Sequence, residues 1–211
     1  MPIKRPWNSP DLEIQLEFIK KYSKLLERAK LLEIILLFYD PVHQLHNTIA
    51  KKCWQEKWKE WTLILNSNTW RKRYTLMSAI NPVTLEYISH NIDWMCNREE
   101  TIKALEKIRS HYPWDKEIVM INDNARYQKS KEVLERAKEL NIIIEYLPPY
   151  CPNLNLIERV HKFFKKQISN QYFPTFKLFV EAIDSISNNF SKYKNDIETL
   201  LSQKFQVFGR F

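Results

Sequence analysis

Residues 33–40 read EIILLFYD, and residues 117–123 read EIVMIND. Both are short, continuous apolar runs that begin at a Glu and finish at an Asp, a pattern typical of strands buried on both faces of a sheet. If the two strands lie parallel and adjacent, Asp40 and Asp123 emerge together at the carboxyl edge of the sheet, where binding sites of such sheets form. An Asp also commonly begins a turn after a strand, and that explanation suffices for either residue alone.

A pair of adjacent carboxylates has a definite chemical requirement. Two negative charges at close range oppose each other's ionisation, and a divalent cation removes that penalty. Oxygen ligands with little support from His or Cys favour Mg²⁺ or Mn²⁺. The matched pair therefore leaves two hypotheses open, a metal site or two unrelated turns.

A third carboxylate lies in the segment LPPYCPNLNLIERVHKFFKK, residues 147–166. Its prolines predict a rigid loop, after which Asn155 and Glu158 have the spacing of a capping box at the start of a helix. Capping and the helix dipole explain Glu158 completely on their own. A rigid loop aimed at the carboxyl edge of the sheet would also deliver this carboxylate to the two Asp residues.

Helices are predicted where apolar residues recur at three- and four-residue steps. Asn97 and Glu100 form a capping-box pattern that opens one helix, which ends before Pro113. Asn141 supplies the C-terminal cap of another helix. The remaining expected helices cover residues 11–30, 129–140, 155–169 and 175–190.

The expected strands are of two kinds. Residues 61–66 and 73–81 read as the arms of an antiparallel hairpin, whereas residues 142–147 form a third buried strand. Residues 83–89 are expected to add an edge strand, residues 1–10 an extended arm, and residues 45–60 are left unassigned. Antiparallel strands beside parallel ones imply an α/β fold with a mixed sheet flanked by helices.

Composition restricts the function further. The single Gly, Gly209, excludes a P-loop and a glycine-rich dinucleotide motif from the body of the chain. A net charge of +8 favours a polyanionic partner, although a basic soluble protein without one is equally compatible. Three widely spaced Cys indicate free thiols in a reducing compartment. The charged N-terminus and short apolar runs lead us to expect a cytoplasmic protein with no membrane association.

The segment LPPYCPNLNLIE, residues 147–158, resembles the signature LPPYSPxLNPIE of the mariner-related bacterial insertion-sequence transposases. INDNARYQKSK resembles the second-acid segment of this family, and FYDPVHQLHNT resembles its first-acid segment. Thirty-four residues separate Asp123 from Glu158, as is usual in the family. The likeness covers about residues 30–170.

The resemblance implies an RNase H-like catalytic domain over residues 31–190, between an N-terminal arm and helix (1–30) and a C-terminal tail (191–211). It implies that Asp40, Asp123 and Glu158 hold two Mg²⁺ ions, with Mn²⁺ as a possible substitute, for cleavage and strand transfer of double-stranded DNA. Relatives act as dimers, so a homodimer is expected. A separate helix-turn-helix chain would supply DNA recognition, and the protein would be associated with the bacterial nucleoid.

Some positions depart from the family pattern. Residues 70, 78, 128 and 156 are Trp, Ser, Gln and Leu, where relatives tend to have Gly, Gly, His and Pro. These departures sustain an alternative, a catalytically weak or inactive remnant that acts only as a DNA-binding or oligomerising regulator. Another nuclease of the same fold, such as a resolvase or ribonuclease H, is a third hypothesis that the Glu158 motif disfavours.

Basic residues suggest where DNA would lie. Residues 51–73 carry a net charge of +5 with four interleaved Trp, which suits phosphate contacts and base stacking, although a solvated Lys face over core Trp residues explains the same pattern. We expect His43 and His46 to be polar neighbours of the site and His161 to face solvent. The candidate DNA-binding residues are Lys51, Lys52, Arg71, Lys72, Arg73, Arg159, Lys162, Lys165 and Lys166.

Overall fold

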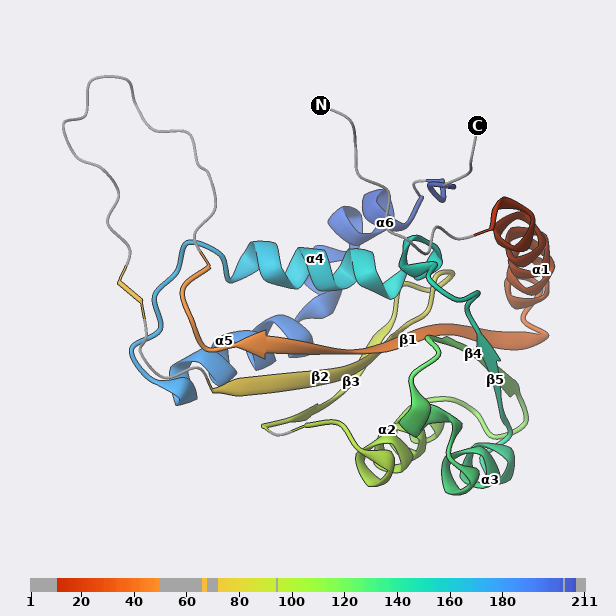
Figure 1. Cartoon of the computed structure of the whole chain (residues 1–211), viewed down its shortest axis with the longest axis horizontal. Helices are drawn as coiled ribbons and strands as arrows, with labels where there is room; N and C mark the ends of the chain where they lie inside the picture. Colours follow the sequence, from red (N-terminus) through yellow and green to blue (C-terminus); the bar gives the residue numbers. More distant parts are fainter. Residues whose placement is uncertain (1–10, 50–65, 68–71, 94, 203, 208–211) are drawn as a thin grey trace.

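Five strands form one mixed sheet in the order β3-β2-β1-β4-β5 (Figure 1). The computed structural model describes residues 11–49, 66–67, 72–93, 95–202 and 204–207. The parallel half pairs β1 with β4 and β4 with β5, whereas β1–β2 and β2–β3 are antiparallel. This arrangement confirms the predicted mixed sheet. The strands are β1 (Ile34–Leu45), β2 (Arg73–Ile80), β3 (Tyr87–Ile92), β4 (Glu117–Asn122) and β5 (Ile142–Tyr146).

The two faces of the sheet are covered by different helices. Ile34, Leu36 and Phe38 belong to one core cluster, and the alternate residues Ile35 and Leu37 belong to the other. This two-sided burial explains why residues 33–40 read as a continuous apolar run. The first face packs against α1 (Leu12–Lys30), α4 (Ile157–Gln167), α5 (Phe176–Asn188) and α6 (Lys194–Ser202), and the second against α2 (Arg98–His111) and α3 (Lys131–Glu139).

Side chains at the helix termini account for most of the observed boundaries. The side chain of Asn97 accepts a hydrogen bond from the Glu100 amide at 2.8 Å, which confirms the predicted start of α2. Ser130 caps α3, so that helix begins at 131, and residues 126–129 form a short 3₁₀ turn instead. Asn141 has a φ of 53°, the left-handed conformation expected just after a helix.

The prediction that residues 73–81 pair with residues 61–66 in a hairpin is wrong. Over Thr75–Ile80, β2 is hydrogen-bonded to β1 on one edge and to β3 on the other, so neither edge is left for residues 61–66. The second arm is correct as a strand, whereas residues 61–65 lie outside the described part of the chain. β1 is longer than predicted and extends past Asp40 to Leu45, because its far half pairs with β2 alone.

The edge strand begins four residues later than predicted. The side chain of Asn81 accepts hydrogen bonds from the amides of Val83 and Thr84, and this fixes a turn where a strand was expected. β3 therefore starts at Tyr87.

The segment predicted as a C-terminal tail contains ordered structure. Residues 190–193 form a 3₁₀ turn, α6 follows, and Tyr193 packs against Phe163 of α4 with ring centroids 5.1 Å apart. The predicted arm over 1–10 lies outside the described residues. None of the described helices is long and apolar enough to cross a membrane. Within the described part, Cys96 and Cys151 are free thiols, as predicted.

Candidate active site

Asp40 and Asp123 lie side by side, as the strand pattern predicts. The parallel register pairs Tyr39 with Asn122, so the next residue of each chain segment is an acid at the same edge. Asp40 stays within the sheet because β1 continues and pairs it with Ser78. Asp123 leaves the sheet, and its carboxylate accepts a hydrogen bond from the Ala125 amide at 3.1 Å. One acid is thus held by the sheet and the other by a tight turn.

Glu158 reaches the same place from α4, which covers the first face of the sheet. The loop after β5 makes a turn at Tyr150, whose φ is 60°, and a 3₁₀ turn over Pro152–Leu154, before α4 begins at Ile157. The Glu158 amide bonds to the backbone carbonyl of Asn155, so the predicted side-chain capping box does not form. Glu158 is therefore not explained as a cap, and its carboxylate lines a pocket of about 450 Å³ together with Asp40 and Asp123.

The electrostatics of this pocket favour a cation. Burial, and then the charges of Asp123 and Glu158, raise the pKa of the Asp40 carboxyl from 3.8 to about 8. A carboxylate in this position is strongly disfavoured without a compensating positive charge. Oxygen donors that repel one another in this way suit a hard divalent ion such as Mg²⁺ or Mn²⁺.

His161 belongs to the site, contrary to the prediction that it faces solvent. It lies one helical turn after Glu158 on α4 and is 2% exposed. Its Nε2 atom is 3.1 Å from the Ser78 hydroxyl, and its Nδ1 atom is 3.8 Å from an Asp40 carboxylate oxygen. The ligand atoms of Asp40, Glu158 and His161 lie within 4.8 Å of one another. The i, i+3 spacing from Glu158 was the available sequence signal.

His43 and His46, which were expected near the site, have structural contacts. His43 is exposed and its Nδ1 bonds to the Thr75 hydroxyl at 2.8 Å. His46 is buried, and its Nε2 contacts the Phe173 carbonyl at 2.8 Å. His43 lies farther along β1, past Asp40, and His46 follows the last residue of the strand.

Asn124 joins the two loops that carry the acids. Its side-chain amide donates to the Leu147 carbonyl at 2.6 Å, and its oxygen accepts from Lys129 at 2.6 Å. The Leu147 amide in turn donates to the Asn122 carbonyl at 2.9 Å. These bonds fix the loop after β4 against the loop that leads to Glu158, which favours a structural role for Asn124.

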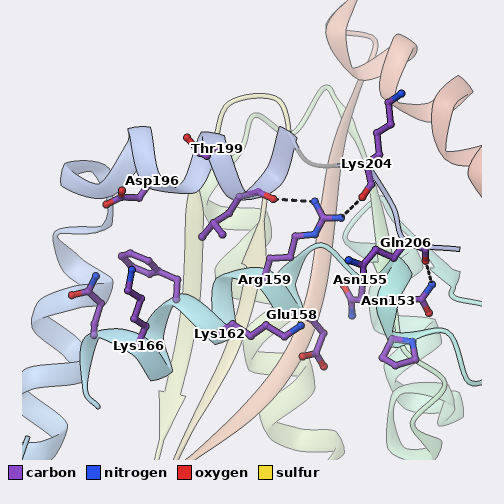
Figure 2. A pocket seen from close by; sticks show the side chains of 14 residues that line it. Asn153, Asn155, Glu158, Arg159, Lys162, Lys166, Asp196, Thr199, Lys204 and Gln206 are labelled. Atoms are coloured by element: carbon purple, nitrogen blue, oxygen red, sulfur yellow. Dashed lines mark hydrogen bonds between the residues drawn. The ribbon is translucent and has the colours of Figure 1, made fainter. Parts of the chain in front are cut away.

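A second, more basic groove lies next to the acid pocket (Figure 2). It has a volume of about 750 Å³, and Lys162, Lys166 and Lys204 are among its lining residues. Glu158 lines both cavities, so they meet at α4.

The candidate DNA-binding residues fall in different places. Arg159 points to α6, where its guanidinium donates to the carbonyls of Leu200 at 2.9 Å and Lys204 at 3.3 Å (Figure 2). Lys162, Lys165 and Lys166 are exposed on α4. Lys72 and Arg73 are exposed at the start of β2; Arg73 pairs with Leu45, five residues and roughly 16 Å along β1 from Asp40. Lys51, Lys52 and Arg71 lie outside the described residues.

Solved structures with this fold include several of the Mos1 mariner transposase. The Mos1 strand transfer complex matches with a TM-score of 0.62 and 13% identity, over 99% of this chain and 67% of that chain. The Mos1 paired end complex with Mg matches with a TM-score of 0.61 and 14% identity, over 99% and 68%. The Mos1 catalytic domain matches with a TM-score of 0.60 and 12% identity, over 98% and 100%. At these identities the likeness establishes the RNase H-like fold.

The family is assigned from the sequence. No curated protein matches the chain. A family model described as DDE superfamily endonuclease matches residues 35–179, which span β1 to the start of α5 and contain all three acids of the pocket. The chain belongs to the DDE superfamily of endonucleases.

Proposed function

We propose that the chain is the catalytic domain of a transposase that cuts and joins double-stranded DNA at the ends of an insertion element. The observation that carries this proposal is the convergence of Asp40, Asp123 and Glu158 on one pocket from β1, the turn after β4 and α4. The family assignment and the fold shared with Mos1 structures support it.

Two Mg²⁺ ions, or Mn²⁺ in their place, would supply charge neutralisation at the phosphoryl group and activation of the attacking oxygen. Asp40 would provide the fixed ligand, because the residues of β1 before and after it are both paired with β2. Asp123 and Glu158 would complete the cradle from a turn and a helix. Solved paired end complexes of Mos1 contain Mg and Mn, in accord with this choice of ions.

The DNA strand would approach along the basic groove. Lys162 and Lys166 lie on the helix that carries Glu158, so phosphates bound there would lead directly to the acid pocket. Arg159 is not needed for this path, because it secures α6.

We further propose that the active unit is a homodimer, that a helix-turn-helix chain supplies end recognition, and that the protein works at the bacterial nucleoid in the cytoplasm. The domain over 31–190 would be the catalytic unit. The related Mos1 structures include paired-end and strand transfer complexes, and these assemblies motivate the proposal of a homodimer.

The test is cleavage of labelled duplex DNA that carries the flanking element ends. Reactions contain Mg²⁺, Mn²⁺ or EDTA, with wild type, Asp123→Asn and a control, Asp115→Asn, whose side chain is exposed away from the site. We expect metal-dependent nicks in wild type and in the control and none in Asp123→Asn. Binding without cutting in either metal, even with a recognition chain added, would establish the alternative, a remnant that only binds DNA or oligomerises.

A further inference from the structure

His161 has a ring nitrogen, Nδ1, that lies 3.8 Å from an Asp40 carboxylate oxygen and bonds to none of the described residues. Its Nδ1 atom is fully buried and makes no hydrogen bond to any described residue. The other ring nitrogen, Nε2, is 3.1 Å from the Ser78 hydroxyl. A buried polar atom without a partner is costly, so such an atom in a functional pocket calls for a ligand.

The Ser78 hydroxyl indicates how the ring is oriented. Ser78 Oγ lies 3.5 Å from the Asp40 backbone carbonyl, which can accept the hydroxyl hydrogen. In that arrangement the Ser78 oxygen accepts from His161 Nε2–H at 3.1 Å. With the proton on Nε2, Nδ1 carries a lone pair directed at the acids.

The geometry fits one ion between these groups. Nδ1 is 3.8 Å from the Asp40 carboxylate oxygen, which is too long for a hydrogen bond. Two ligands of an octahedral ion, each at about 2.1 Å, lie roughly 3 to 4 Å apart. A carboxylate oxygen of Glu158 completes the set within 4.8 Å.

We propose that His161 Nδ1 is a direct ligand of one of the two metal ions, and that the site therefore binds Mn²⁺ in preference to Mg²⁺. Imidazole nitrogen is a better ligand for a transition metal than for Mg²⁺, which prefers oxygen. Ser78 acts as a positioning residue, because it holds the tautomer that leaves Nδ1 free. This inference rests on the proposed function of the same pocket and adds a fourth protein ligand to it.

The first experiment measures the bond itself, in the unmodified protein. Mn²⁺ is added to the full chain in the absence of DNA, and electron spin-echo modulation reports any ¹⁴N nucleus bonded to the ion. We expect a histidine nitrogen coupling that disappears in His161→Gln and persists in His43→Gln, a control histidine on β1 bonded to Thr75 instead. Gln keeps a polar group near the Nε2 position and offers none at Nδ1, so the contact with Ser78 can survive.

The second experiment measures affinity by calorimetry, with circular dichroism as the check of folding. We expect His161→Gln to weaken Mn²⁺ binding roughly 10- to 100-fold and Mg²⁺ binding by a smaller factor. His161→Asn, which retains an atom near Nδ1, should recover part of the loss.

The outcomes separate the two proposals. Mn²⁺ binding that requires Asp123 but shows no nitrogen coupling in wild type would overturn the His161 inference and leave the three-acid site intact. No Mn²⁺ binding by wild type would overturn both.

Discussion

Replacement of Asp40 by Asn removes a carboxylate whose ionisation the fold opposes. An acid whose pKa is raised in the folded state holds its proton more tightly there than in the unfolded chain. The folded protein therefore loses stability as pH rises from about 4, the pKa in the unfolded chain, to about 8, the pKa in the fold. The loss is absent below that window and complete above it. Asp40→Asn should remove this loss in metal-free protein.

The size of the effect follows from the two pKa values. At pH 7 the displacement from 3.8 to about 8 corresponds to about 4 kcal/mol, at 1.36 kcal/mol for each pH unit above 3.8. The Asp40 side chain is 15% exposed, and water and rearrangement in the open pocket reduce the penalty, so we expect roughly 1–3 kcal/mol. That is a rise in Tm of roughly 3–10 °C for a chain of this size.

The assay is thermal unfolding in EDTA near pH 5, 7 and 8.5, followed by the same series with Mn²⁺. The gap between Asp40→Asn and wild type should widen with pH, while metal should raise the Tm of wild type and leave Asp40→Asn unchanged. Asp115→Asn, an exposed acid, is the matched control. An Asp40→Asn protein that is no more stable than wild type in EDTA, or that keeps the metal-induced rise, refutes the reasoning.

Three other expectations concern binding and stability. The double variant Lys162→Ala, Lys166→Ala should weaken DNA binding in EDTA and reduce the slope of log K against log salt by about 1–2, as measured by titration at several salt concentrations. The control Lys107→Ala, on the opposite face, should change neither the affinity nor the slope. Arg109→Met should cost roughly 2–4 kcal/mol in a urea titration, because the buried guanidinium donates to three backbone carbonyls; an unchanged midpoint contradicts this. Asn97→Ala should lower Tm by about 2–4 °C through loss of the α2 cap, and Asn97→Asp should restore it.

The parts of the fold set by local pattern were predictable from sequence. The apolar runs that end at Asp40 and Asp123 are buried on both faces, so their composition alone identifies them as central strands. The Asn97 cap and the positive φ of Asn141 likewise follow from a few neighbouring residues. The juxtaposition of the two Asp follows as soon as the strands are taken as parallel neighbours.

Most of the wrong predictions concern places where residues distant in the sequence determine the structure. Nothing near residue 73 reveals that β1 rather than residues 61–66 occupies one edge of β2. His161 is polar and is predicted to face solvent, yet packing of α4 on the sheet buries it against Ser78. Asn155 and Glu158 match a capping box in spacing, but the 3₁₀ turn before α4 directs the backbone of Asn155 to the bond instead. Tertiary pairing and packing override the local signal in the first two cases, and a neighbouring 3₁₀ turn does so in the third.

β1 continues past Asp40 and stays in the ladder with β2, whereas Asp123 opens the turn after β4 and Glu158 lies at the start of α4, after a loop. In hydrogen exchange, the amides around Asp40 should therefore open only with the whole domain, while those of the two loops open in smaller and less costly events. The three acids would then differ in mobility as well as in position. One acid is an immobile reference point, and the other two can adjust as phosphate geometry changes from one chemical step to the next, with no movement of the sheet.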